Sequence, residues 1–329
     1  MSGMNPAETI MHAATTYWLS RCVHVVASLG VADAVGDAPT PIADIASRVG
    51  ANPAALSRVF RLLASHGIFE IRAEGYAHND ASRLLRSDDP RSLRPYAQMI
   101  GSPLCWASYG LLEHSVRTGR PATTEIAPDG FFGYFGAHPE EGKIFDAAMG
   151  AKAHEQIGTV LSAYDFSGFA TISDIGGGGG HLLRAVLDAV PGSQGVLFDL
   201  PHVIQGAAAM GGNRLTLVAG DFFKDALPVS DAYLLMEVIH DWGDPEALAV
   251  LKAIRAAAPP TAKVVIVENV VPEAPGPHFS KGLDITMLAM TGGLERTPAE
   301  YDGLFEKAGF RRSRVFPTPS VTVIEAIPV

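Results

Sequence analysis

Residues 171–189 read TISDIGGGGGHLLRAVLDA, and this stretch decides the fold class. An apolar run of strand length leads directly into five glycines, Gly176 to Gly180, and these lead into a helical pattern. Because glycine has no Cβ, the backbone of such a loop can approach a ligand closely, and the following helix N-terminus favours a carboxylate or a phosphate. The stretch therefore predicts a cofactor or nucleotide site at a strand-to-helix turn.

Two common ligands of glycine loops do not fit the spacing. A dinucleotide fingerprint would place its third glycine at one of three positions, which here hold His181, Leu182 and Leu183. A phosphate-binding P-loop needs a lysine at the start of the helix, and this stretch contains none. A dehydrogenase is therefore disfavoured, and a nucleoside ligand without a pyrophosphate remains.

The pattern around the glycine loop continues to the C-terminus. Apolar runs of strand length alternate with helices, which favours an α/β fold with a mostly parallel, Rossmann-like sheet covered on both faces. The last two runs, RRSRVFPT and SVTVIEAI, are separated by a short turn at Pro319 and predict an antiparallel hairpin. The earlier strands are TISDI, GVLFDL, RLTLVAG, AYLLMEVI and KVVIVENV, and helices are expected over residues 181–189, 203–210, 245–257, 283–290 and 298–308.

The composition disfavours several classes of protein. With 329 residues, 47% hydrophobic and 18% charged, the chain is long enough for about two domains and too apolar for a disordered protein. Its net charge of -10, without a basic stretch, argues against nucleic acid as a partner. Cys22 and Cys105 lack zinc or disulfide spacing, which predicts a reducing compartment. We see no signal peptide and no run of about 18 apolar residues, and so expect a soluble, cytoplasmic protein without membrane contact.

The N-terminal part indicates a small helical domain. Apolar residues at helical spacing follow Pro41, and again follow Asn52 and Pro53, a typical N-cap and first helical residue. The runs IFEI and YAHN then predict a hairpin, so the outline is that of a winged helix. Positions 1–100 hold nine arginines and no lysine against nine acidic residues, so this part has no net positive charge to attract DNA phosphates. The expected helix over 17–29 is apolar on more than one face, which predicts packing against a second subunit.

Acidic side chains occur at the ends of three predicted strands. Asp174 precedes the glycines, Asp199 ends the next strand, and Asp221 with Phe222 ends the third. The carboxyl ends of parallel strands share one edge of the sheet, where ligands of open α/β sheets bind. Asp199 could accept hydrogen bonds from both hydroxyls of a ribose, and Asp221 could accept one from an adenine amino group. One such Asp could equally be a loop cap, but three together favour a ligand.

A histidine and two glutamates are expected at the same edge. His240 follows the strand AYLLMEVI, Glu268 ends the next strand, and Glu295 lies in a loop beyond the following helix. A carboxylate bonded to one imidazole nitrogen fixes the tautomer and leaves the other nitrogen to take a proton. The alternative for His240 is a residue that only begins a helix.

These motifs together resemble one family. The segments are DIGGGGG (174–180), FDLP (198–201), GDFF (220–223), HDW (240–242) and GLERT (293–297). The series looks like that of the S-adenosylmethionine-dependent O-methyltransferases of caffeate, hydroxyindole and bacterial polyketide-tailoring type, and the resemblance covers nearly the whole chain. It implies a class I methyltransferase sheet, S-adenosylmethionine as cofactor with S-adenosylhomocysteine as product, no metal, and a homodimer. It also implies a winged-helix dimerisation domain over 1–95, a helical connector and substrate-pocket segment over 96–165, and the cofactor-binding domain over 166–329.

The resemblance further implies roles for single residues. His240 is implied as the general base, with Glu268 and Glu295 as the side chains that orient it. The implied cofactor contacts are Gly176 and Gly178 for the methionine part, Asp199 beside Leu200 for the ribose, and Asp221 with Phe222 for the adenine. The candidate walls of the acceptor pocket are Trp106, Phe145, Met149, Met287 and Met290, for which core packing is the alternative; the resemblance favours Met149 and Met287.

The implied reaction transfers a methyl group to a hydroxyl of a small aromatic acceptor, typically a secondary metabolite. A phenol of pKa about 10 is poorly matched to a histidine near about 6.5, so we expect help from the positive sulfur of the cofactor or from an acidified acceptor. Met236 and Glu237 stand where many relatives carry Lys or Arg, so part of the cofactor contact set is expected to differ. Three alternatives stay open: N-methylation of a heterocycle, non-methylating chemistry on the same cofactor, and a cofactor-sensing regulator.

Overall fold

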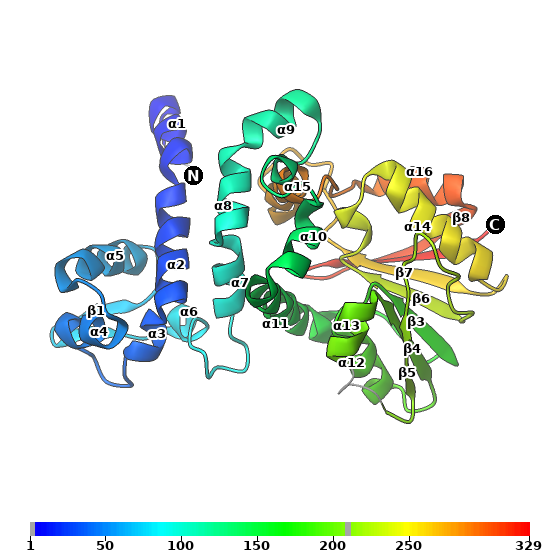
Figure 1. Ribbon diagram of the computed structural model, residues 1–329, viewed down its shortest axis with the longest axis horizontal. Helices are drawn as coiled ribbons and strands as arrows, with labels where there is room; N and C mark the ends of the chain where they lie inside the picture. The colour runs from blue at the N-terminus through cyan, green and yellow to red at the C-terminus, as the bar shows by residue number, and fades with distance from the viewer. Residues whose placement is uncertain (1–3, 208–211) are drawn as a thin grey trace. The chain divides into compact units, whose positions relative to one another are not determined.

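The computed structural model describes residues 4–207 and 212–329. The chain divides into two compact units, and each unit contains two stretches of sequence (Figure 1). The first unit comprises Met1–Trp106 and Pro139–Lys152, and the second comprises Ala107–His138 and Ala153–Val329. Helices α8 (Pro103–Gly110) and α11 (Pro139–Ala163) include residues of both units.

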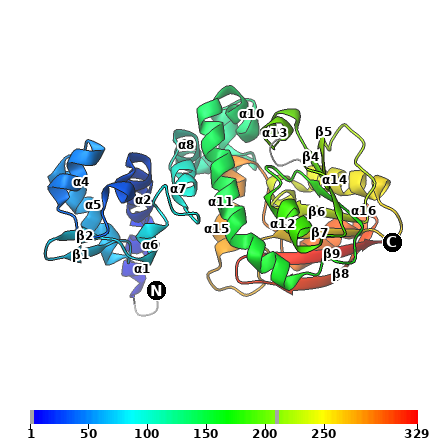
Figure 2. The same ribbon diagram turned by 90° about the horizontal axis from the view of Figure 1, so that it is seen from below.

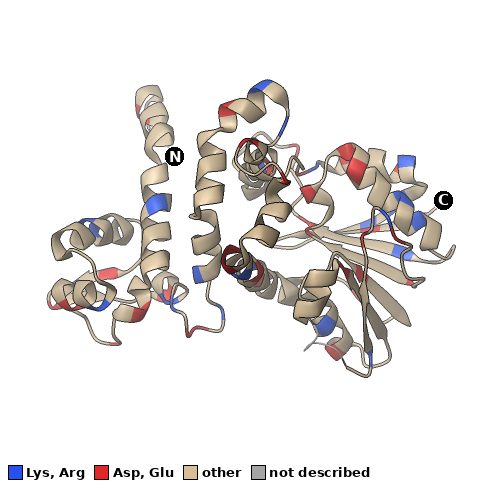
Figure 3. Cartoon of the chain, in the orientation of Figure 1, with Lys and Arg blue, Asp and Glu red and all other residues tan. Residues whose placement is uncertain are grey.

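The first unit consists of helices and one small hairpin. Asn52 caps α5 by accepting a hydrogen bond from the amide of Ala55, and Pro53 is the first helical residue, as predicted. The hairpin strands pair antiparallel, and Phe60, Phe69 and Tyr76 pack in the core beside them. Lys, Arg, Asp and Glu are interspersed along its helices (Figure 3). Its elements are α1 (Pro6–Thr15), α2 (Tyr17–Leu29), α3 (Val31–Ala34), α4 (Ile42–Val49), α5 (Pro53–Ser65), β1 (Glu70–Arg72), β2 (Gly75–Ala77), α6 (Asp80–Arg83) and α7 (Arg94–Ile100).

The second unit contains a seven-stranded sheet with the order β5-β4-β3-β6-β7-β9-β8. The first five strands in chain order run parallel, and β8 and β9 form an antiparallel hairpin whose second strand pairs with β7. The strands are β3 (Thr171–Ile175), β4 (Gln194–Asp199), β5 (Leu215–Ala219), β6 (Ala232–Met236), β7 (Lys263–Glu268), β8 (Phe310–Pro317) and β9 (Thr322–Pro328). The helices are α9 (Leu112–Thr118), η1 (Ala122–Glu125), α10 (Gly130–Ala137), α12 (His181–Ala189), α13 (Pro201–Gly206), η3 (Ile239–Asp241), α14 (Asp244–Ala257), α15 (Phe279–Met290) and α16 (Pro298–Ala308).

Helices cover both faces of the central strands (Figure 2). Along β6, Tyr233 and Leu235 pack in one hydrophobic cluster with α14 and α16. Their neighbours Ala232 and Leu234 pack in a second cluster with α12. Successive side chains of a strand point to opposite faces, so a strand between two helical layers must be apolar at every position. This is the reason for the unbroken apolar runs in the sequence.

The predicted α/β sheet is confirmed, with three differences in detail. Strand β6 ends at Met236 because the backbone of Glu237 turns into the left-handed region at φ 54. Helix α15 begins at Phe279, before the predicted start near Leu283. Helix α13 covers Pro201–Gly206 and so begins before the predicted start near Val203, while the predicted helix end at Met210 lies outside the described residues.

A buried carboxylate, Glu325 on β9, joins the antiparallel hairpin to the rest of the sheet. Its Oε2 accepts hydrogen bonds from the Tyr164 hydroxyl at 2.7 Å and from Lys263 Nζ at 2.8 Å. Its Oε1 accepts from Ser313 Oγ and from Arg314 Nε. Burial alone would raise the pKa of Glu325, but the hydrogen bonds from Lys263, Ser313 and Tyr164 outweigh it and lower the pKa to about 2.

We predict that Glu325→Gln lowers the free energy of unfolding at neutral pH by about 2 kcal/mol or more, because it leaves buried donors and a cation without their partner. A depressed pKa stabilises the fold above the ordinary carboxyl pKa, and the contribution is lost as pH falls toward 2. The gap between wild type and variant in urea unfolding should therefore narrow below about pH 4.5. The exposed Glu306→Gln is the control, and an equal effect of both variants would contradict the assignment.

Candidate functional site

The glycine loop between β3 and α12 exposes backbone at the carboxyl edge of the sheet. Gly176, Gly178 and Gly180 adopt positive φ angles of 70, 57 and 72 degrees, which side chains rarely allow. A Cβ on Gly177 would lie 2.4 Å from Asp174 Cγ, whereas a Cβ on Gly178 would meet nothing within 4 Å. The loop is therefore packed on its inner side and uncovered at Gly178.

Asp199 holds this loop in place. Its Oδ2 accepts a hydrogen bond from the amide of Gly178 at 2.8 Å, and its Oδ1 accepts one from the amide of Leu200 at 2.7 Å. The structure thus brings Gly178, Asp199 and Leu200, three predicted cofactor contacts, into one hydrogen-bonded group. Because Asp199 ends β4, the carboxylate is fixed beside the bare glycine backbone by the sheet itself.

Asp221 and Phe222 follow β5 on the same edge. Asp221 accepts hydrogen bonds from Lys224 Nζ at 2.7 Å and from the amide of Phe223 at 2.9 Å, and these two contacts lower its pKa. The Phe222 ring reaches the glycine loop, since its Cε1 lies 3.5 Å from the position of a Cβ on Gly176. Phe222 therefore joins the loops after β3 and β5, as its predicted place beside a cofactor requires.

Asp174 is buried beneath the loop, with 1% of its surface exposed. Within the described residues its Oδ1 has no hydrogen-bond partner. Burial, together with the negative charge of Asp199, raises the pKa of Asp174 to about 7. A buried carboxyl oxygen without a partner, next to uncovered backbone, is the arrangement expected where a polar ligand completes the hydrogen bonding.

His240 lies in the short turn η3 between β6 and α14. Its Nδ1 is 2.6 Å from Oε1 of Glu295, and both residues are almost fully buried. Its Nε2 lies 3.7 Å from Oδ1 of Asp241. The carboxylate on Nδ1 fixes the ring and selects Nε2 as the nitrogen that can exchange a proton.

Carboxylates change the acidity of this imidazole. Burial alone would lower the pKa of His240, but the charge of Asp241, the hydrogen bond to Glu295 and the charge of Glu268 raise it to about 10. Burial also raises the pKa of Glu295. The mismatch with a phenol that we inferred from an ordinary histidine is therefore narrowed by the protein's own carboxylates, before any help from a cofactor or an acidified acceptor.

Glu268, predicted to orient the imidazole, contacts the backbone of His240 instead of its ring. Its Oε1 accepts from the amides of Val238 at 3.2 Å, Ile239 at 2.6 Å and His240 at 3.1 Å. Its Oε2 accepts a short hydrogen bond from the Tyr301 hydroxyl, which is fully buried. Glu295 alone of the two predicted glutamates contacts the imidazole.

Residues without a predicted role also surround His240. Arg296 is fully buried and donates to the carbonyls of Ile239 and Trp242. Gly293 packs so closely that a Cβ there would lie 2.0 Å from the His240 carbonyl oxygen. Both belong to the GLERT segment of the family pattern, residues 293–297. The sequence of this segment does not show that the Arg296 side chain points inward. Its hydrogen-bond partners are therefore known only from the structure.

Glu237 carries the predicted departure from the family pattern. It is one of two non-glycine residues with positive φ within residues 4–207 and 212–329, and its Oε1 lies 3.4 Å from Nδ2 of Asn269. The left-handed backbone places this acidic side chain between the ends of β6 and β7. The described structure thus has a carboxylate at the position where the family resemblance predicts a basic residue.

The predicted acceptor-pocket residues fall in different units. Trp106, Phe145 and Met149 belong to the first unit, and each is half-buried there. Met287 and Met290 belong to the second unit and are buried on α15, with 8% and 3% exposed. The ring of Trp106 has the Arg21 guanidinium 5.0 Å from its centre, so part of its surface is already covered.

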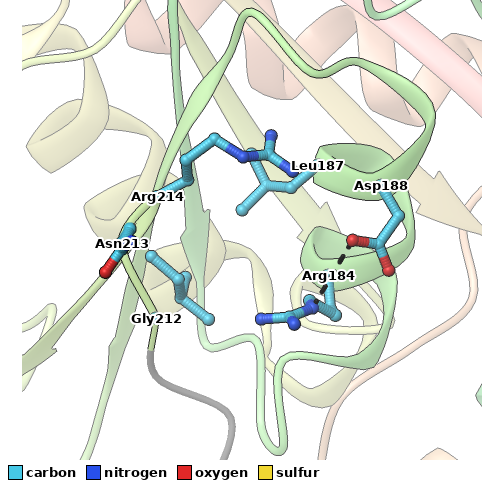
Figure 4. A pocket seen from close by; sticks show the side chains of 7 residues that line it. Arg184, Leu187, Asp188, Gly212, Asn213 and Arg214 are labelled. Carbon is cyan, nitrogen blue, oxygen red and sulfur yellow. Dashed lines mark ion pairs between the residues drawn. The ribbon is translucent and has the colours of Figure 1, made fainter.

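Two other hollows lie away from the glycine loop. One, of about 150 Å³, is lined by Arg184, Arg214 and neighbours at the amino end of β5 (Figure 4). The other, of about 350 Å³, is lined by residues 161–167 with Ala189 and Val190. The first faces the opposite edge of the sheet from Asp199 and contains the ion pair of Arg184 with Asp188. Over the described ranges no three or more His, Cys, Asp or Glu side chains are grouped to hold a metal, and no helix there could span a membrane.

Comparison with known proteins identifies the family. A profile of the O-methyltransferase domain matches residues 109–311, and a profile of the O-methyltransferase dimerisation domain matches residues 11–88. The chain belongs to the O-methyltransferase family. The phenazine O-methyltransferase PhzM of Lysobacter antibioticus is 40% identical over 100% of this chain and 98% of that protein. The crystal structure of LaPhzM superposes with a TM-score of 0.92 at 38% identity, covering 99% of this chain and 100% of the other.

Other members of the O-methyltransferase family indicate the cofactor and the range of acceptors. Human N-acetylserotonin methyltransferase in complex with SAM has a TM-score of 0.91 at 27% identity and covers 100% of this chain and 99% of that one. The 8-amino-8-demethylriboflavin N,N-dimethyltransferase of Streptomyces davaonensis is 35% identical over 92% of this chain and 89% of that protein. The chain is a methyltransferase that depends on S-adenosylmethionine. The bare backbone at Gly178, the fixed carboxylate of Asp199 and the unpartnered oxygen of Asp174 fit that cofactor.

Gly293 offers a direct test of the packing around His240. We predict that Gly293→Ala lowers the free energy of unfolding by about 2 kcal/mol or more, because its methyl group would overlap the His240 carbonyl and push the two loops apart. Gly282→Ala on α15 is the matched control, since a Cβ there meets nothing within 4 Å and alanine favours a helix by up to about 1 kcal/mol. Urea unfolding of both variants would measure the contrast, and equal stabilities would refute the packing.

Proposed function

We propose that this O-methyltransferase methylates a hydroxyl of a small aromatic acceptor, with His240 as the general base. The contact between Nδ1 of His240 and Glu295 carries the proposal, because it leaves Nε2 as the proton acceptor at the carboxyl edge of the sheet. His240 Nε2 takes the proton of the acceptor hydroxyl, and the carboxylates of Glu295 and Asp241 stabilise the imidazolium that results.

The cofactor would be held by the glycine loop and the acidic strand ends. Gly176 and Gly178 would border its methionine part, with open space at Gly178. Asp199 with Leu200 would hold the ribose hydroxyls, and Phe222 with Asp221 would border the adenine. When bound, S-adenosylmethionine supplies an electrophilic methyl group on a positively charged sulfur. A buried site favours the transfer, since water stabilises separated opposite charges more than merging ones.

The acceptor site and the oligomeric state belong to the same proposal. Met287 in the second unit is proposed as a wall that contacts a flat aromatic ring, and Trp106, Phe145 and Met149 of the first unit stay predictions from the family resemblance. A homodimer is supported by the matched dimerisation domain and by large exposed apolar side chains on its first helices. These are Ile10, Met11, Tyr17, Trp18 and Leu29. Residues 1–95 would then form the dimer, 96–165 the pocket connection and 166–329 the cofactor domain.

Methylation of a nitrogen is the second candidate. It is favoured by the 35% identity to the 8-amino-8-demethylriboflavin N,N-dimethyltransferase from Streptomyces davaonensis. A neutral nitrogen needs no prior loss of a proton, so its methylation would depend little on His240. The two functions are therefore separated by how strongly the reaction requires that residue.

We predict that His240→Gln lowers kcat for a phenolic acceptor by about 10²-fold or more, because glutamine cannot accept the proton. Methyl transfer would be followed by mass spectrometry over a panel of phenols and heterocyclic amines. Binding of S-adenosylhomocysteine, measured by calorimetry, should stay within about threefold of wild type and shows that the variant is folded. Full turnover in the variant with intact cofactor binding would reject His240 as the base and favour the nitrogen acceptor.

The pH dependence of the reaction gives a second test of His240 as the base. A base must be unprotonated to act, and the carboxylates around His240 raise its pKa to about 10, so kcat/KM should rise with pH above neutrality. A nitrophenol that is already ionised across the range needs no base, so with this acceptor the limb should disappear in the wild type and His240→Gln should lose little rate. If the wild type keeps the limb with the nitrophenol, the limb does not report removal of the acceptor proton, and the assignment of the base fails.

A further inference from the structure

The turn η3, which carries His240, is held at both of its ends by buried charged side chains. It is only three residues long, Ile239–Asp241, and lies between β6 and α14. At its amino end, Oε1 of Glu268 accepts hydrogen bonds from the amides of Val238, Ile239 and His240. A short turn leaves most of its backbone groups without internal partners, so its position depends on what binds them from outside.

Arg296 binds the carbonyl end of the same turn. Its Nη1 donates to the carbonyl of Ile239 at 3.1 Å, and its Nη2 donates to the carbonyl of Trp242 at 2.9 Å. Its Nε and Nη2 also donate to Oδ1 of Asp244, at 3.1 and 2.9 Å, and Asp244 begins α14. One planar guanidinium therefore fixes the backbone one residue before and two residues after His240, together with the start of the next helix.

A fully buried guanidinium is a costly way to stabilise a protein. Its ion-pair partner Asp244 has a side chain that is 62% exposed, so solvent weakens the attraction, whereas the arginine is 0% exposed. Apolar side chains of similar volume often stabilise such a place as well or better. What they cannot do is hold two carbonyls and a carboxylate at fixed angles, and that is the property the site around His240 needs.

We propose that Arg296 is a positioning residue for methyl transfer, which sets the place of the His240 ring through the backbone on either side of it. The inference rests on the proposed role of His240. Arg296 directly follows Glu295 in the chain, so one residue binds the ring at Nδ1 and the next binds the backbone that carries it. Loss of Arg296 frees the turn to shift while Glu295 stays, which moves Nε2 relative to the acceptor.

The test uses Arg296→Lys and Arg296→Met in the full-length protein. A misplacement of about 1 Å can cost about 10²-fold in rate, so we expect Arg296→Met to lower kcat about 10²-fold and Arg296→Lys to lower it less, since lysine keeps the charge but not the planar fork. Binding of S-adenosylhomocysteine should stay within about threefold of wild type, because Arg296 contacts no residue of the glycine loop in the described structure. Arg312→Met is the matched control: it removes a two-contact ion pair with Asp302 elsewhere in the same unit, and its kcat should be unchanged.

A double-variant cycle distinguishes positioning from a general loss of stability. If Arg296 acts through His240, the variant His240→Gln with Arg296→Met is no slower than His240→Gln alone, whereas independent structural damage would add to the loss. Should Arg296→Met fail to fold, the same cycle is run with Arg296→Lys. Wild-type kcat in a folded Arg296 variant, or additive losses in the cycle, would overturn the proposal. Unchanged activity of His240→Gln by itself would instead overturn the proposed function.

Discussion

The contact between a buried imidazole and a buried carboxylate is the interaction on which the site depends. Nδ1 of His240 and Oε1 of Glu295 are 2.6 Å apart, and the two residues are separated by more than fifty positions in the chain. Such a pair is stable inside a protein only when other groups fix both partners. Much of the polar structure around η3 serves this purpose, with Glu268 on its amides and Arg296 on its carbonyls.

The parallel sheet explains why so many functional groups meet at one edge. β3, β4, β6 and β7 run in the same direction and end at Ile175, Asp199, Met236 and Glu268. The ends of these strands and the loops after them carry the glycines, Asp199, the histidine turn and Glu268, which binds the amides of that turn. Aromatic rings link these loops laterally, since Phe222 and Phe223 both pack against Trp242. The parallel sheet brings these loops to one edge, and the aromatic side chains set the distances between the loops.

Patterns that reflect burial were readable from the sequence. The unbroken apolar strands, the glycine turn and the C-terminal hairpin are confirmed because each has a period or a residue requirement that the letters show directly. The sequence also placed His240, Glu268 and Glu295 at one edge. It could not tell that Glu268 binds amides while Glu295 binds the ring, since both are glutamates at strand or loop ends.

Other features depend on contacts that have no local signature. The inward orientation of Arg296 and the left-handed backbone of Glu237 arise from segments far apart in the chain. The raised pKa of His240 likewise depends on Asp241, Glu295 and Glu268 together, and no reading of one motif would supply it. The expectation that cofactor or acceptor chemistry must compensate for a weak base followed from treating the histidine as an isolated group.

Gly293 sits against the peptide of His240 and Asp241 with no space for even a methyl group. The length and backbone path of the loop between α15 and α16 are therefore coupled to the chemistry in a way that the surfaces of those helices are not. Substitutions on the exposed face of α15 leave this contact unchanged. An insertion or a bulkier residue in this loop would instead displace His240 and stop methyl transfer, whichever acceptor is bound.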